Sequence, residues 1–268
     1  LFSLWAFLII IFRDIPAMSL VVRMKGHNAI SPCRMCKITG VRVPNSAGTT
    51  HYVPLDRSQH PEVRNSVDAV KRYDPSRLPL REHAEMLQQA QEVQSAQTVA
   101  QASALSKLYG IHGIPLLSHL KSLSFPQSFP FDFMHLIWEN LIPNLVLLWT
   151  GGFKGLGEGD GTYQLEKTVW DAIGEAGVVA GDTVPYVIGP RLPNIARDTS
   201  GCNADGWSMW ALYVGPVLLR RKFKNMKYYK HFTELVKLLP LCLEFELAAE
   251  DVEVIWQGFI DWVVTYER

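Results

Sequence analysis

Two cysteines three positions apart are the residues whose spacing most clearly indicates chemistry. Cys33 and Cys36 form a C-x-x-C that follows Pro32 and precedes Gly40. A tight turn lets both thiolates face one ion, and Zn²⁺ then needs two further ligands, for which His27 lies nearest upstream among several histidines. A redox site would place the motif at a helix N-terminus within a βαβ pattern, which these flanks do not indicate. The spacing predicts a structural zinc site, and two unligated cysteines are the alternative.

A single carboxylate follows the apolar run that opens the sequence. Asp14 comes just after Leu1–Phe12 and directly before Ile15 and Pro16. At the end of a core strand it would bind Mg²⁺, and two such ions held by carboxylates activate water and stabilise the leaving oxygen in phosphodiester cleavage. Aspartate is also common where a strand turns near proline. The residues alone favour the turn.

Three polar side chains interrupt an apolar helical pattern further along the chain. Asp132 and His135 are three positions apart, and His135 and Glu139 are four apart, so all three lie near one face of a helix. Asp132 also suits a helix N-cap or first turn, and His135 suits a core histidine bonded to Glu139. On these residues alone, a structural role is favoured over catalysis.

Basic residues cluster in one segment of the chain. Aromatic residues interleave with the cations, and the set is Arg220, Arg221, Lys222, Phe223, Lys224, Lys227, Tyr228, Tyr229 and Lys230. Cations mixed with aromatic rings suit contacts with a nucleic-acid backbone. Lys and Arg at a helix end would equally complement the helix dipole. Both interpretations stay open at this point.

Hydrophobic patterning predicts the elements that must position these residues. Leu1–Phe12 predicts a strand buried on both faces, with a helix as its rival. The run is too short to span a bilayer as a helix, which needs about 20 residues, and it lacks the basic start of a secretory signal. Residues 25–40 predict a polar hairpin, and residues 41–80 an irregular connection.

The sequence of residues 81–268 predicts mainly helices. Residues 81–109 contain no Gly or Pro and predict one long solvated helix that ends at Gly110. Residues 132–149 predict a helix that Pro143 kinks or splits. Further amphipathic helices are predicted over residues 163–176, 204–223, 228–247 and 249–267.

Composition excludes several classes of protein. The 268 residues are 48% hydrophobic, which is enough apolar material for a buried core and excludes wholesale disorder. Four cysteines are too few for a disulfide-built scaffold. Lys plus Arg and Asp plus Glu both number 26, so the formal net charge is zero. The chain therefore has no global basic field, and any nucleic-acid binding must come from a local patch or from sequence outside this chain.

Taken in order along the chain, these motifs resemble the CACTA (En/Spm-like) transposases in their fungal form. The resemblance covers nearly the whole chain rather than one motif. The stretches that carry it are Asp14–Ala17, Lys25–Asn28, Pro32–Cys36, Phe129–His135 with Glu139 and Asn140, Leu145–Trp149 followed by Gly151, the helix around Trp170, Asp205–Trp207, and Tyr229–Phe232.

The resemblance implies an α/β fold in which a fragment of an RNase H-like core, a strand plus a zinc hairpin (residues 1–40), precedes a mostly helical insertion (residues 81–268). It implies DNA cleavage and strand transfer by Mg²⁺ or Mn²⁺ bound to an acidic triad. Asp14 matches the second acid, and Asp132 with His135 matches a D-x-x-H motif. The first acid is expected before Leu1 and the last beyond Arg268.

Within the chain, Glu139 and Glu267 are weaker matches to the final acid. Because two of the three acids are expected outside the chain, the isolated chain is expected to be inactive.

The same resemblance implies a nuclear protein that binds transposon ends and forms an oligomer as part of its parent protein. Arg220, Arg221, Lys222 and Lys224 are the residues expected to contact nucleic acid. The alternative function is a non-catalytic, zinc-stabilised interaction module derived from a transposon. A protein anchored in a membrane by residues 1–12 is a third, weaker hypothesis, and we expect no membrane association.

Overall fold

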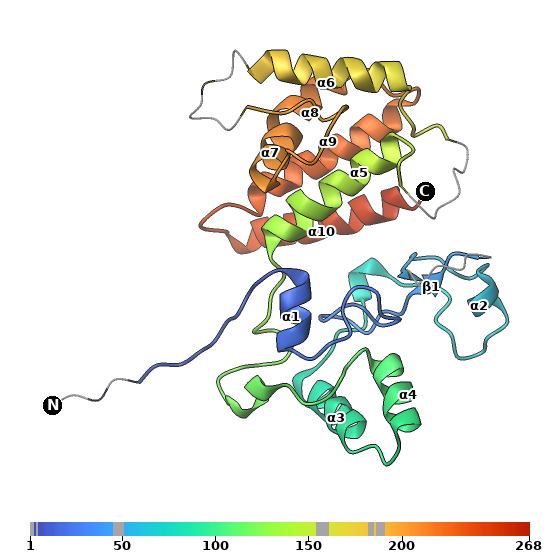
Figure 1. Ribbon diagram of the computed structural model, residues 1–268, viewed down its shortest axis with the longest axis vertical. Coiled ribbons are helices and arrows are strands. Elements are labelled where there is room, and N and C mark those ends of the chain that lie inside the picture. Colours follow the sequence, from blue (N-terminus) through green and yellow to red (C-terminus); the bar gives the residue numbers. More distant parts are fainter. Residues whose placement is uncertain (1–2, 4, 45–50, 154–160, 182–184, 186–190) are drawn as a thin grey trace. The chain divides into compact units, whose positions relative to one another are not determined.

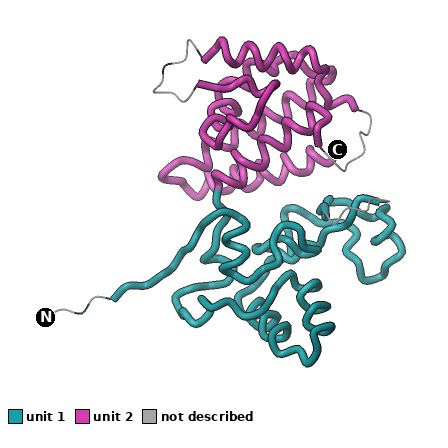
Figure 2. The backbone as a smooth tube through the Cα atoms, viewed as in Figure 1, with its two compact units in different colours: residues 1–132 teal, residues 133–268 magenta. Residues whose placement is uncertain are grey.

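The computed structural model describes residues 3, 5–44, 51–153, 161–181, 185 and 191–268 (Figure 1). The chain folds as two compact units, Leu1–Asp132 and Phe133–Arg268 (Figure 2). The helical region predicted to begin at residue 81 is therefore shared between the two units. About half of the described residues are helical, and they form one two-stranded sheet, which is the part of the predicted α/β class that the structure supports.

Unit 1 combines short helices with long irregular connections. Its antiparallel sheet pairs β1 with β2, in the register Val41 to Tyr52. The elements are α1 (Ile15–Val21), β1 (Val41–Arg42), β2 (His51–Tyr52), α2 (Pro61–Arg64), the 3₁₀ turn η1 (Pro75–Arg77), α3 (His83–Gln94), α4 (Val99–Tyr109) and the 3₁₀ turn η2 (Leu116–His119). The described part of residues 41–80 is irregular between these short elements, but it contains β1, β2, α2 and η1, so it is not the purely irregular connection that was predicted.

The core of unit 1 forms where α1 and α3 meet the loop that follows α4. Met18 of α1 and Met86 of α3 are fully buried, together with Ile111, Phe125 and Phe129 of that loop. The rings of Phe125 and Phe129 lie 4.6 Å apart. This cluster holds the loop segments next to the paired cysteines in a defined position.

The single long helix predicted over residues 81–109 is wrong. The structure divides it into α3 and α4, which pack against each other. Thr98 begins the second helix, because its hydroxyl accepts the amide hydrogen of Gln101 at 3.1 Å. The Thr-x-x-Gln spacing was the available signal for this break. Gly110 ends α4 with a positive φ of 72°, as predicted.

The buried strand predicted at the start of the chain is also wrong. Residues 5–14 form neither strand nor helix and run as an extended chain (Figure 1), and residues 1, 2 and 4 lie outside the described residues. Trp5 is 79% exposed and Phe7 is 70% exposed. Within the described residues the sheet contains only β1 and β2, so this segment has no ladder to join. It touches unit 1 through the Ile11 amide, which donates to the Ser128 carbonyl at 2.9 Å.

Among the residues that the structure describes, no helix has the length and apolar character needed to cross a bilayer. The exposed apolar side chains at the start of unit 1 belong to an extended segment rather than to a helix.

Unit 2 is a helical assembly, as the sequence predicted. Its elements are the π-helical segment η3 (Met134–Leu141), α5 (Ile142–Trp149), α6 (Lys167–Gly181), α7 (Ala204–Met209), the π-helical segment η4 (Trp210–Val214), α8 (Gly215–Leu218), α9 (Met226–Leu241) and α10 (Ala249–Tyr266). The helices predicted over residues 163–176, 228–247 and 249–267 are present with shifted bounds. The helix predicted over residues 204–223 ends early, at Leu218.

Proline explains both π-helical segments. Pro143 lies in the first turn of α5, directly after η3, and Pro216 occupies the same place in α8 after η4. Proline lacks the amide hydrogen of a regular helical bond, and its ring crowds the carbonyl four residues earlier. A locally widened helix relieves that crowding while the chain continues in the same direction. The predicted split at Pro143 therefore takes the form of a change in helix type.

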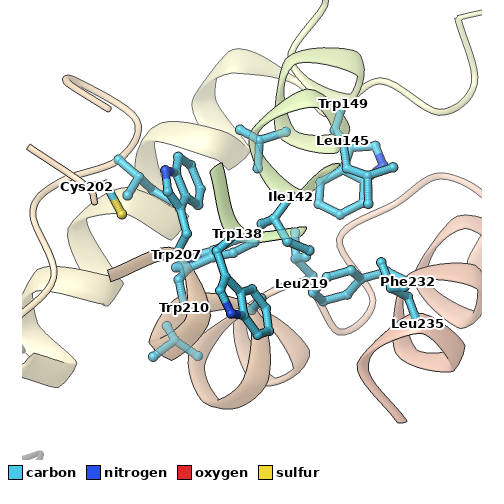
Figure 3. Close-up of a cluster of buried hydrophobic side chains, with 14 of the residues drawn as sticks. Trp138, Ile142, Leu145, Trp149, Cys202, Trp207, Trp210, Leu219, Phe232 and Leu235 are labelled. Atoms are coloured by element: carbon cyan, nitrogen blue, oxygen red, sulfur yellow. The ribbon is translucent and has the colours of Figure 1, made fainter. Parts of the chain in front are cut away.

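The core of unit 2 is built on tryptophan rings (Figure 3). Trp210 is 1% exposed, and its ring centroid lies about 6 Å from those of Trp170, Trp207 and Phe232. Trp149 of α5 meets Phe232 of α9 edge-to-face at 5.2 Å. Aromatic pairs in such geometry add to the free energy gained by burying their surface. These contacts fix α5, η4 and α9 against one another.

Candidate nucleic-acid interface and predicted metal sites

The structure brings Cys33 and Cys36 together in unit 1. The Cys36 amide donates to the Cys33 sulfur at 3.4 Å, so the backbone folds tightly around that sulfur. Cys36 is buried and Cys33 is partly buried, and both are free thiols. Cys36 also pairs with Leu80 in an isolated antiparallel bridge. The tight turn predicted for the C-x-x-C motif is confirmed.

Two buried arginines hold this cysteine segment in place. Arg81 is 3% exposed, and its guanidinium donates to the carbonyls of Cys33 at 3.0 Å and Tyr109 at 2.9 Å. The guanidinium of Arg34 donates to the carbonyls of Phe129 at 2.8 Å and Pro130 at 2.7 Å. Sequence analysis missed both, because a charged residue in a polar hairpin or at a helix start gives no sign of burial.

The two thiols have opposite acidities. The Cys36 thiol donates to the Cys33 sulfur, and this hydrogen bond is the main reason that the pKa of Cys33 falls to about 6. Burial of Cys33 opposes the fall, whereas the amides of Cys36 and Met35 and the charge of Arg81 add to it. The same bond, followed by burial, raises the pKa of Cys36 well above its ordinary value. Cys33 is therefore the nucleophilic thiol of the pair at neutral pH.

We expect iodoacetamide to alkylate Cys33 in chelator-treated protein with a rate that rises with pH around a midpoint near 6. The thiolate is the nucleophile, so reactivity falls as Cys33 protonates below that pH. Cys242 serves as an internal control, because burial raises the pKa of its thiol. Mass spectrometry of peptides alkylated at several pH values measures both. A midpoint for Cys33 at or above that of Cys242 would contradict the geometry.

The cysteine pair accounts for two of the four ligands that the predicted zinc site needs. His27, the third ligand predicted, is exposed. Within the described residues, no group of three or more His, Cys, Asp or Glu side chains is arranged to hold a metal ion. Structural Zn²⁺ takes four ligands, so the described residues do not complete a zinc site around Cys33 and Cys36. Zinc binding at Cys33 and Cys36 stays a prediction, and it needs ligands other than those that the described residues bring to the two thiols.

Asp14 caps a helix rather than ending a core strand. Its carboxylate accepts the Ala17 amide at 2.6 Å, and it precedes Ile15 and Pro16 in the first turn of α1. An N-cap carboxylate satisfies an amide that the helix leaves unpaired and stabilises the positive end of the helix dipole. The structural interpretation of Asp14, at a turn beside proline, is therefore the one that matches the structure.

The D-x-x-H residues fall at the division between the units. Asp132 is the last residue of unit 1, and His135 belongs to η3 in unit 2. The ring of His135 lies 3.5 Å from the carboxylate of Glu139, with both side chains partly exposed. The predicted pairing of His135 with Glu139 is confirmed, although His135 is not a core histidine.

The basic segment forms an exposed turn between α8 and α9 in unit 2. We call Arg220, Arg221, Lys222 and Lys224 the basic turn, and all four are exposed. Phe223, in their midst, is buried and packs edge-to-face on Trp149 at 5.5 Å. Arg221 has a positive φ of 61°, which turns the chain sharply. Burial of Phe223 therefore anchors this short loop to the core, and the four cations around it stay exposed.

The helix dipole separates the two interpretations of these cations. Arg220 to Lys222 follow the end of α8, where positive charge is favourable. Lys224 and Lys227 instead flank the start of α9, where a cation adds to the positive end of the dipole and is unfavourable. Lys224 has an exposed ion pair with Glu166 at 3.5 Å, and such pairs contribute little. The helix dipole therefore accounts for the cations after α8 but not for those at the start of α9.

Comparison with known proteins adds no relative. No family model matches the chain, and no curated protein or solved structure is significantly similar to it. The chain itself therefore presents two separate candidate sites, which are the paired thiols within unit 1 and the basic turn within unit 2.

Proposed function

We propose that the chain is part of the catalytic region of a DDE-type DNA transposase and that its own role is to hold transposon-end DNA on the basic turn. The observation that carries the proposal is the structure of the basic turn. Its four cations are exposed, and Phe223 between them is buried in the core and anchors the turn. The order of the motifs resembling CACTA transposases supports the same role. The predicted RNase H-like core and nuclear location form part of this proposal.

Electrostatics explains how a chain of zero net charge would bind DNA. Each Lys or Arg that neutralises a phosphate releases condensed counterions, and this term supplies most of the non-specific affinity. The basic turn concentrates that effect in a few residues. Lys227 at the start of α9 extends the positive region along the chain. Two of the three acids of strand transfer are expected elsewhere in the parent protein, so in this proposal the isolated chain binds and positions DNA without cutting it.

We expect replacement of all four basic-turn residues by glutamine to weaken binding of a fluorescein-labelled DNA duplex by about tenfold or more at low salt. Fluorescence anisotropy of the full chain measures the affinity. A matched control replaces four exposed cations of unit 1 by glutamine, namely Arg64, Arg77, Lys107 and Lys121. The control carries the same change in net charge but leaves the basic turn intact.

Equal weakening in the two variants would show that net charge alone holds the DNA, which would contradict the proposal. Unchanged affinity in the basic-turn variant would contradict it too. Circular dichroism checks that both variants keep the helical content of the unmodified chain.

The second candidate is a non-catalytic, zinc-stabilised interaction module derived from a transposon. The use of Asp14 as a helix cap favours it, because the one triad acid expected in this chain already bonds to an amide. Such a module would bind its partner equally well with Mg²⁺ or with a chelator of divalent ions. It would also contain stoichiometric zinc that a Cys33→Ser, Cys36→Ser double variant loses. A DNA affinity that rises strongly with Mg²⁺ would exclude it.

A further inference from the structure

Unit 2 contains a pocket of about 510 Å³ that neither the basic turn nor the predicted acids use. Side chains of α5, α9 and the end of α10 line it, together with Tyr163 from the connection before α6. Leu145 and Trp149 of α5 give it apolar surface. Its volume lies within the range of pockets that take small molecules.

Aromatic rings make up much of the lining. Tyr163 and Tyr228 meet edge-to-face at 6.2 Å. His231 and Tyr266 belong to a near-parallel stack with Trp262, in which His231 and Trp262 lie 4.5 Å apart at 15°. Backbone bonds fix the stack, because the His231 ring contacts the Trp262 carbonyl at 3.0 Å and the Trp262 indole donates to the His231 carbonyl at 3.0 Å. The rings therefore present a preformed surface for a flat ligand.

The polar groups of the lining are neutral or cationic. Lys227 and Arg268 are the charged groups among its described residues, and the Lys227 ammonium lies 4.8 Å from the centre of the Tyr228 ring. Burial lowers the pKa of His231, which keeps its ring neutral at pH 7. Burial chiefly raises the pKa of Tyr266, aided by the charge of Glu267, so the Tyr266 hydroxyl keeps its proton. The described lining itself includes no carboxylate, and Glu267, which follows Tyr266, is the acid whose charge acts on the pocket from beside it.

This combination selects one class of ligand. A purely apolar ligand would gain nothing from Lys227, and inorganic phosphate would gain nothing from the tyrosines. A nucleotide uses both, because its base stacks on aromatic rings and its phosphate pairs with a cation. We propose that the pocket binds one unpaired nucleotide, with the base against the tyrosine and histidine rings and the phosphate near Lys227.

The pocket and the basic turn are linked along the chain. Lys227 lies three residues after Lys224, in the first turn of α9, the helix that also contributes Tyr228 and His231 to the pocket. A strand crossing the basic turn could therefore deliver an unpaired base to the rings. The inference thus extends the proposed function, but a free mononucleotide would bind by the same chemistry.

Two probes distinguish these sources: 2′-deoxyadenosine 5′-monophosphate and a single-stranded oligonucleotide that carries 2-aminopurine. Thr265→Trp should fill the pocket from an exposed helical position, and Lys227→Gln removes the cation. The matched controls are Gln257→Trp on α10 and Lys237→Gln on α9, which lie outside this lining. Calorimetry follows the mononucleotide, and fluorescence follows the oligonucleotide.

We expect saturable binding of at least one probe, weakened about fivefold or more by Thr265→Trp and severalfold by Lys227→Gln, with both controls unchanged. Binding of both probes identifies a nucleotide site, and binding of the oligonucleotide alone identifies a strand site. An abasic oligonucleotide that binds as well as the 2-aminopurine strand would overturn the proposal, as would binding of neither probe or an unaffected Thr265→Trp variant. The basic-turn variant should keep its affinity for the mononucleotide, so failure of the DNA-binding proposal is recognised separately.

Discussion

Replacing Trp210 with alanine is expected to destabilise unit 2 by about 3–5 kcal/mol. Trp210 is fully buried, and its ring contacts those of Trp170, Trp207 and Phe232. Alanine removes that apolar surface from the core and leaves a cavity that these large rings cannot close without leaving their rotamers. The loss should spread through the helices that share the cluster.

Hydrogen exchange of the full chain measures this effect helix by helix. Amides of α5, α7 and α9 should exchange faster in the variant, whereas those of α3 and α4 in unit 1 should keep their rates. Trp256→Ala is the matched control, because Trp256 of α10 is 48% exposed and should cost far less. Equal effects of the two substitutions would contradict the placement of the core.

Replacing Arg81 with methionine is expected to destabilise unit 1 by about 3 kcal/mol. Methionine approximates the length of the side chain but leaves the carbonyls of Cys33 and Tyr109 without their charged donor. Buried polar groups that lose a partner carry the full penalty of desolvation. Because Arg81 ties the cysteine segment to the end of α4, its loss should loosen that segment first.

The alkylation rate of Cys36 in native protein reports that loosening directly. Cys36 is buried in the intact chain, so faster alkylation in Arg81→Met is the expected result. Arg77→Met is the matched control, because Arg77 is exposed. A variant that unfolds at the same denaturant concentration as the control, with Cys36 still protected, would contradict the role assigned to Arg81.

Local patterns were sufficient to predict most helices of unit 2. Amphipathic spacing located α6, α9 and α10, and Pro143 marked the change between η3 and α5. Spacing also predicted the tight turn at Cys33 and Cys36. These features depend on interactions between residues close in sequence, so the sequence carries them directly.

Features that depend on distant residues were not predictable in the same way. The apolar run before Asp14 resembles a core strand, yet a strand needs partners, and the described residues provide none beside it. The break between α3 and α4 had a local signal in Thr98 and Gln101, but the burial of Met86 and Val93 beside it depends on packing against other elements. The burial of Arg81 depends on carbonyls far along the chain that accept its hydrogen bonds. The pocket beside Tyr228 is lined by side chains from several helices.

The dependence of DNA affinity on salt tests the central claim most directly. Each phosphate neutralised on duplex DNA contributes about 0.9 to the slope of log affinity against log salt concentration. If the basic turn holds the DNA, neutralising its four cations should reduce the steepness of that slope by up to about 3–4, while the unit 1 control keeps the original slope. An unchanged slope in the basic-turn variant would contradict the account.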